Sequence, residues 1–123
     1  MRNSIANMLH KELILNTRFD ANKLFGNTTG KAILTDVTDG YDYKDGKKTD
    51  VVTHQKYVVA IAERQFEKLT VKIAGTKPII TAEQLAQKGG HVNVQFKNLT
   101  GKLYSKDNGY ELSCSADGIE VVS

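Results

Sequence analysis

Apolar and β-branched residues recur in five short runs that are separated by polar, glycine-containing stretches. The runs are residues 31–38 (KAILTDVT), 51–62 (VVTHQKYVVAIA), 69–74, 91–105 and 110–122. Runs of this length, rich in valine, isoleucine and threonine and bounded by turn residues, are typical of β-strands. The pattern therefore predicts a mainly β protein with five strands.

Within a strand, successive side chains point to opposite faces. In the second run this places Tyr57, Val59 and Ile61 on one face, with His54 and Lys56 on the other. The first set is apolar enough to face a core. The second set is expected at the surface.

Two segments are predicted to be helical. Residues Asn3–Asn16 carry Ile5, Leu9 and Leu13 at four-residue spacing, which indicates an amphipathic N-terminal helix. This helix either packs on the domain or an interface, or binds a partner. Thr81–Gln84 has the pattern of a capping box and opens a short helix, which Gly89 and Gly90 are expected to end.

The connections supply further expectations. Residues 17–30 are predicted to form a loop anchored in the core by Phe19, Leu24 and Phe25. Gly101 is expected to mark a bend in the fourth strand, and a second bulge is expected at Asp117–Gly118 in the fifth.

Three strands, a helix and two strands is the element order of an OB-fold, a five-stranded, partly open barrel that binds oligonucleotides through strands 2 and 3 and two loops. The polar stretches Asp39–Asp50 and Ser105–Gly109 fall at those two loops. A two-sheet sandwich or an unrelated small barrel also fits five strands. We expect one domain over residues 1–123, with the N-terminal helix at 1–16 and the barrel at 31–122.

Composition narrows the functional classes only a little. The net charge is +3, and all but three of the 17 basic residues are lysines. Lysine is a point charge suited to phosphates, whereas arginine suits base edges. A nucleic-acid partner would therefore be bound without regard to sequence. No apolar run is long enough to span a membrane, and a lone Cys114 without a secretory signal predicts a cytoplasmic protein.

Several short motifs resemble a known family. They are Phe25-Gly26, the strand Tyr57–Ile61, the segment Phe66–Ile73 with a proline at 78, and Ala116-Asp-Gly-Ile119. In this order and spacing they are similar to small auxiliary replication factors, also called helicase-processivity factors, of plasmids and conjugative elements in Gram-positive bacteria. The usual closing pattern of that family is Ala-Asp-Asp-Ile, so Gly118 departs from it. The resemblance implies an OB-fold that binds single-stranded DNA and assists a relaxase or helicase.

Single-strand binding without sequence preference needs a basic groove and aromatic side chains on which bases stack. Lysines and tyrosines of the two loops and of the polar strand faces are the candidates for these roles. They are Tyr41, Tyr43, Lys44, Lys47, Lys48, Lys56, Lys72, Lys97, Lys102, Tyr104, Lys106 and Tyr110.

Two alternatives concern the same residues. Tyr104 and Tyr110 could instead pack on each other as a cross-strand pair beside a hairpin turn. The aspartates of the first loop oppose its lysines, yet their spacing, from Asp39 to Asp50, does not match a calcium-binding loop.

Enzyme functions have little support. No phosphate-binding glycine loop or metal-ligand spacing is present, and no cofactor is expected. His54 reads as a surface side chain and Cys114 as a buried core thiol. The sequence thus predicts a non-catalytic DNA-binding protein, with a protein–protein interaction module as the alternative. Self-association through exposed strand edges stays open.

Overall fold

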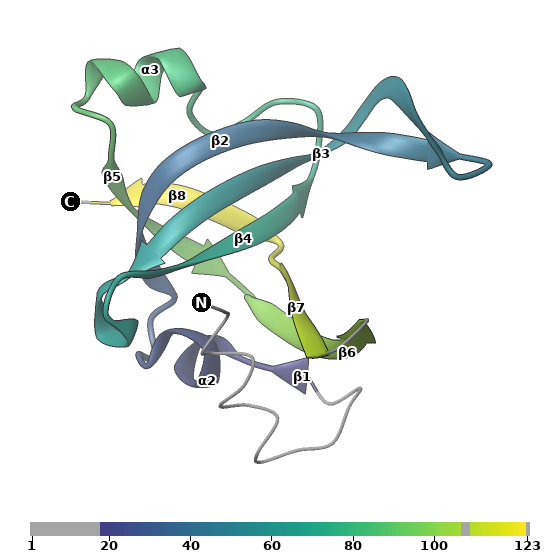
Figure 1. The fold of residues 1–123 in the computed structure, drawn as a ribbon. Coiled ribbons are helices and arrows are strands. Elements are labelled where there is room, and N and C mark those ends of the chain that lie inside the picture. Colours follow the sequence, from purple (N-terminus) through teal and green to yellow (C-terminus); the bar gives the residue numbers. More distant parts are fainter. Residues whose placement is uncertain (1–17, 107–108, 123) are drawn as a thin grey trace.

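The computed structural model of the protein describes residues 18–106 and 109–122, and the predicted N-terminal helix lies outside them. Strands dominate (Figure 1). In chain order the elements are β1 (Arg18–Phe19), α2 (Ala21–Phe25), β2 (Lys31–Lys44), β3 (Lys47–Ile61), a 3₁₀ turn (Ala62–Arg64), β4 (Glu67–Ala74), α3 (Ala82–Gln87), β5 (Val92–Lys97), β6 (Thr100–Lys106), β7 (Gly109–Ser115) and β8 (Gly118–Val122).

Within the described residues the strands form one sheet in the order β1-β6-β7-β4-β3-β2-β5-β8. The β4–β7 pair is parallel and the other pairs are antiparallel. Consecutive strands β5 and β6 lie toward opposite ends of this order, as do β7 and β8, so the sheet must curl round on itself. Figure 1 shows the resulting barrel-like wall. The prediction of a mainly β, barrel-like protein is confirmed.

The predicted number of five strands is wrong, because the two C-terminal runs are each divided and the short strand β1 is added at the edge of the sheet. Asn98, with φ of 54°, separates β5 from β6. The second break precedes Gly118, where Asp117 N–H donates to the Lys97 carbonyl at 2.9 Å. Gly101 does not mark the bend. It lies within β6, where a Cβ would come 2.9 Å from Leu24 Cδ2, so Leu24 packs closely against this glycine.

The polar stretch Asp39–Asp50 joins two antiparallel strands, as strand–turn–strand predicts, but the predicted long loop is wrong. β2 continues to Lys44, β3 begins at Lys47, and the two strands project from the body as a two-stranded arm (Figure 1). The turn is Asp45-Gly46, with φ of 53° and 78°. Positive φ at both central residues is the geometry of a type I′ turn, for which Asp-Gly is a preferred sequence. We call residues 41–52 the arm.

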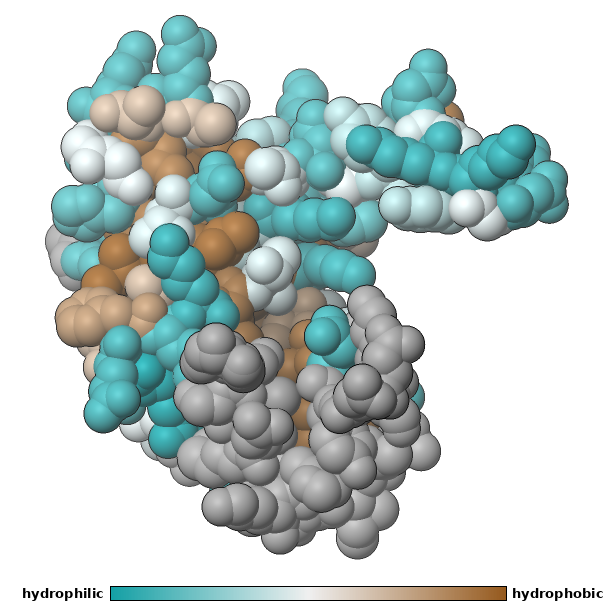
Figure 2. Space-filling view, in the orientation of Figure 1, coloured by the Kyte–Doolittle hydropathy of each residue, from teal (hydrophilic) through white to brown (hydrophobic). Residues whose placement is uncertain are grey.

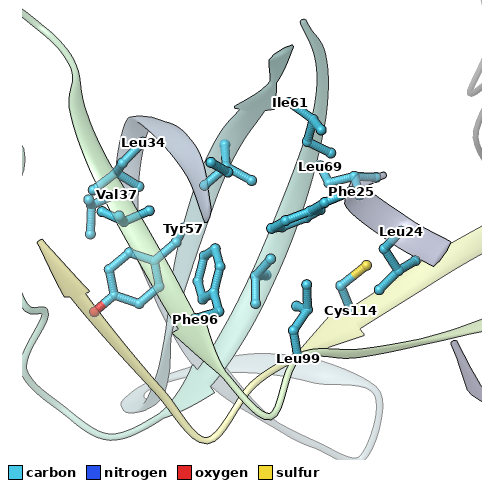
Figure 3. Close-up of a cluster of buried hydrophobic side chains, with 14 of the residues drawn as sticks. Leu24, Phe25, Leu34, Val37, Tyr57, Ile61, Leu69, Phe96, Leu99 and Cys114 are labelled. Carbon is cyan, nitrogen blue, oxygen red and sulfur yellow. The ribbon is translucent and has the colours of Figure 1, made fainter. Parts of the chain in front are cut away.

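The core fills the inside of the curled sheet (Figure 3). The predicted anchors are buried: Phe19 is 6% exposed, and Leu24 and Phe25 are fully covered. The Phe25 and Phe96 rings meet edge to face, with centroids 6.1 Å apart. The predicted loop at 17–30 instead contains β1 and α2, since these apolar anchors fix short regular elements. Cys114 is a core thiol as predicted, and burial raises its pKa to about 12.

The predicted helix at Thr81 is confirmed. Thr81 Oγ1 accepts a hydrogen bond from the Gln84 backbone N–H at 3.0 Å, and Gln84 Oε1 accepts one from the Thr81 backbone N–H at 2.9 Å. This reciprocal pair is a capping box. The helix ends before Gly89 and Gly90, which have φ of 91° and 90°. α3 closes one end of the barrel-like wall through its buried Leu85.

Candidate nucleic-acid interface

A row of polar side chains crosses five neighbouring strands. Lys56 in β3 stands directly opposite Lys72 in β4. The row extends to Thr38 in β2, opposite Lys56, and to Ser115 in β7, opposite Lys72. Thr100 in β6, opposite Ser115, completes it. Residues directly opposite each other project from the same face. We call these five residues the cross-sheet row.

The row faces solvent. The preceding or following residue in each strand is buried, including Val37, Tyr57 and Val71, so alternation turns the row outward. Lys72 is exposed and Lys56 is half-buried. The β3–β4 ladder over a packed core therefore holds the two lysines opposite each other.

Two lysines directly opposite each other repel, which destabilises a sheet. None of the five residues of the row is acidic, and its three hydroxyl groups can each donate a hydrogen bond. Such an arrangement suits an anion with several oxygen acceptors, because the lysines supply charge and the hydroxyls supply further donors.

Two more predicted lysines lie beside the row. Lys102 is half-buried opposite Ser113 in the β6–β7 ladder. Lys97 is exposed at the end of β5, and its carbonyl accepts a hydrogen bond from the Asp117 backbone N–H. The neighbouring Ala116 N–H donates to the Lys72 carbonyl at 3.1 Å. These backbone bonds bring the β5 end close to the row.

The arm carries the remaining predicted residues whose side chains are described. Lys44 and Lys47 stand opposite each other next to the turn and form a second lysine pair. Lys48 Nζ lies 4.4 Å from the centre of the Tyr41 ring, a cation–π contact, and Tyr43 is 66% exposed. In Figure 2 the arm is mainly hydrophilic.

Two register shifts separate the arm from the cross-sheet row. They lie at Gly40/Tyr41 and Tyr41/Tyr43 in the β2–β3 ladder. Irregularities of this kind interrupt the alternation of side chains between the two faces. The Lys44–Lys47 pair is therefore a second basic site on the same two strands, separate from the row.

Two aspartates of β2 are partly engaged. Asp39 accepts a hydrogen bond from Gln55 Nε2 at 2.9 Å, and Asp42 accepts one from the Tyr43 backbone N–H at 3.0 Å. Among the described residues, no three histidine, cysteine or acidic side chains gather into a possible metal site.

The side chains of Tyr104, Lys106 and Tyr110 lie outside the described part of the chain. Their backbones are placed: Tyr104 stands opposite Glu111, and Tyr110 opposite Ser105. The two tyrosines are therefore not directly opposite each other, as the alternative cross-strand pair requires.

His54 is not the surface side chain that the sequence predicts. It is half-buried, and its ring occupies the space that a Cβ on the opposite residue, Gly40, would need. Nδ1 is 2.9 Å from Thr53 Oγ1, whereas Nε2 is buried without a hydrogen-bond partner. Burial, then Lys72 and Lys56, lower its pKa. This packing follows from the register of β2 and β3, which places Gly40 opposite His54, and it cannot be seen in the sequence of either strand alone.

A hollow of about 610 Å³ lies at the base of the arm and was not predicted. Its lining residues come from β2, β3 and the segment around α3. They are Val37, Thr38, Asp39, Tyr41, Gln55, Thr76, Pro78, Thr81 and Ala82. One side of the hollow is held in place by Tyr57, whose hydroxyl accepts a hydrogen bond from the Ile79 N–H at 2.9 Å. The sequence gives no signal for this site, since its residues meet only when the segment after β4 folds back over β2.

No helix in the described part of the chain is long and apolar enough to span a membrane. Comparisons of the chain with protein-family models, with curated proteins and with solved structures find no match. The resemblance to plasmid and conjugative-element replication factors therefore stays a prediction.

Proposed function

We propose that the curled sheet is an OB-fold. If the two-residue strand β1 is set aside and β5–β6 and β7–β8 are each taken as one interrupted strand, five strands remain. In chain order these are β2, β3, β4, β5–β6 and β7–β8. The first strand pairs with the second and the fourth, and the second pairs with the third. The fifth strand pairs in parallel with the third and antiparallel with the fourth. The helix α3 lies between the third and fourth. This element order and the curled, barrel-like closure support an OB-fold.

We propose further that the protein binds single-stranded DNA without sequence preference and catalyses no reaction. The observation that carries this proposal is the opposed pair Lys56 and Lys72. The pair lies on the strands corresponding to strands 2 and 3 of an OB-fold, which is the usual oligonucleotide surface. A bound polyanion attracts both ammonium groups and offsets the repulsion between them, so the pair is best satisfied when phosphates are bound.

The chemistry of the row explains the lack of sequence preference. Lysine and hydroxyl donors contact phosphates and sugars, which all nucleotides share. Neighbouring strands lie about 4.8 Å apart, so five strands span about 19 Å, enough for several nucleotides. The Lys44–Lys47 pair adds a second opposed pair of lysines on the arm. Following the family resemblance, the bound strand belongs to the replication or conjugative transfer of a mobile element in the cytoplasm, where a relaxase or helicase is the partner.

Fluorescence anisotropy tests the proposal. Labelled oligo-dT and a duplex of equal length are titrated with the protein at several salt concentrations. We expect tighter binding to the single strand and a steep salt dependence. Replacing both Lys56 and Lys72 with alanine should lower the slope of log K against log salt by about 1.4, because each lost single-strand phosphate contact removes about 0.7.

The matched control replaces two exposed lysines outside the row, Lys31 and Lys88, with alanine. The slope of this control should change less than that of the row variant. Absence of any oligonucleotide binding, or equal losses in the two double variants, contradicts the proposal.

A second candidate function is a protein–protein interaction module that does not bind nucleic acid. It is favoured by large apolar side chains at the surface, namely Val51 on the arm (55% exposed), Ile79 (46%) and Val121 (44%). Figure 2 shows hydrophobic surface on the body, away from the arm. Two results together would support this function. The parent protein binds no oligonucleotide, and a variant in which glutamate replaces Lys44, Lys47, Lys48, Lys56 and Lys72 still binds the protein partner.

A further inference from the structure

The hollow at the base of the arm adjoins the cross-sheet row. Thr38 belongs to both: it stands opposite Lys56 in the row and it lines the hollow. Beyond Leu34, β2 pairs only with β3 in the described part of the chain, because β5 pairs with residues Lys31–Leu34 alone. A strand held on the row can therefore pass over the open edge of β2 at Thr38 and enter the hollow.

The hollow offers a stacking surface. Tyr41 lines it and is half-buried, so its ring is held in place. Lys48 Nζ lies over that ring, 4.4 Å from its centre. The ammonium covers one face of the ring, which leaves the other for a flat aromatic group. Stacking on a tyrosine is open to every nucleobase.

A carboxylate in the same hollow discriminates between ligands. Asp39 Oδ1 accepts a hydrogen bond from Nε2 of the buried Gln55 at 2.9 Å, which orients the carboxylate and leaves Oδ2 for a ligand. A carboxylate repels phosphate, so the backbone of a nucleic acid does not belong here. It accepts hydrogen bonds from amino groups, which cytosine (N4), adenine (N6) and guanine (N2) carry, whereas thymine has no amino group.

We infer that this hollow binds one unstacked nucleobase of the strand held on the row and favours a base with an amino group (cytosine, adenine or guanine) over thymine. The inference rests on the proposed function and deepens it. The lysines of the row bind any sequence, and the hollow adds a preference at one nucleotide. Tyr41 stacks on the base, Asp39 accepts from its amino group, and Gln55 positions Asp39.

The test is an anisotropy titration of the full-length protein with labelled oligo-dC and oligo-dT of equal length at neutral pH. We expect oligo-dC to bind roughly tenfold tighter, the range given by one good base-edge contact. Asp39→Asn should remove most of this preference, since the amide presents donors as well as an acceptor. It should fold, because its carbonyl can still accept from Gln55.

Asp36→Asn is the matched control, because Asp36 is exposed on β2 outside the hollow. It should keep the preference for oligo-dC. Tyr41→Ala should weaken both oligonucleotides roughly tenfold, whereas Tyr43→Ala, outside the hollow, should have a smaller effect. A thermal melt of each variant verifies folding.

The outcomes separate the two proposals. Equal binding of oligo-dC and oligo-dT that still depends on Lys56 and Lys72 overturns this inference and leaves the proposed function standing. A preference that Asp39→Asn retains also overturns it. If neither oligonucleotide binds the parent protein, the proposed function fails and this inference fails with it.

Discussion

The arm and the wall of the barrel are built from the same two strands, yet their surroundings differ. In the wall, β2 and β3 are flanked by β5 and β4, and residues such as Val37, Tyr57 and Val59 are buried against the core. Among the residues that the structure describes, the strands of the arm pair only with each other, and their register shifts at Gly40/Tyr41 and Tyr41/Tyr43. Each region carries a pair of lysines that stand opposite each other on neighbouring strands, Lys56 and Lys72 in the wall and Lys44 and Lys47 in the arm.

This difference separates two ways of presenting positive charge. An isolated two-stranded ribbon is at best marginally stable in water, so the arm can adapt to a ligand. The wall holds Lys56 and Lys72 in a ladder fixed by the packed side chains beneath it. We therefore expect the wall to supply a fixed phosphate site and the arm to supply an adjustable one.

The largest contrast concerns stability. Phe96→Ala removes a buried ring that packs against Phe25 and should lower the free energy of unfolding by about 3–5 kcal/mol. Tyr43→Ala in the arm removes a mostly exposed ring and should change it by less than about 0.5 kcal/mol. Urea denaturation measures both. Similar losses in the two variants would refute the contrast between wall and arm.

The junction of the two regions should show the next largest effect. In Gly40→Ala the new methyl group meets the His54 ring, so we expect a loss of about 1–3 kcal/mol in unfolding free energy. In a His54→Ala background the same change should cost much less, since the obstructing ring is gone. A double-mutant cycle by urea denaturation measures this coupling. Additive effects would rule out the proposed packing.

A smaller effect of opposite sign, an increase in stability, is expected at the opposed lysines of the barrel wall, Lys56 and Lys72. Lys72→Thr removes the repulsion from Lys56 and should raise the free energy of unfolding by about 0.2–1 kcal/mol while weakening oligonucleotide binding. The matched change in the arm, Lys47→Thr opposite Lys44, should alter stability less, because solvent surrounds both groups. Thermal unfolding in low salt compares the two. A destabilised Lys72→Thr protein would count against repulsion in the wall.

The smallest effect should appear on acidification. The pKa of His54 is lowered in the folded protein from its ordinary value of 6.5, so the unfolded chain binds the proton more readily. Stability is then complete above about pH 6.5 and decreases as the pH falls below it. His54→Gln should flatten the melting temperature between pH 7 and pH 5. An unchanged slope in this variant would exclude His54 as the titrating group.

Several elements could be predicted because their signals are local. The alternation of Tyr57, Val59 and Ile61 predicts a buried strand face, and all three are buried. The capping box at Thr81 specifies a helix start from four consecutive residues. Asp45-Gly46 carries a hairpin signal of the same kind, although the surrounding charges favoured a loop.

The candidate site could be predicted only in part. Lys56 and Lys72 were expected on polar strand faces, but nothing in the sequence states that they stand opposite each other. Thr38, Ser115 and Thr100 join them from three further strands, and the hollow depends on the segment after β4.

The sequence by itself determined which side chains of each strand face the core, because alternation follows from the geometry of a single extended backbone. The tertiary structure decided which strands became neighbours and in what register. Those choices depend on the closure of the sheet around Phe25, Phe96 and the rest of one shared core, so no single segment encodes them. For this reason the sequence predicted lysines on polar strand faces, but it did not predict that Lys56 and Lys72 stand opposite each other in one row.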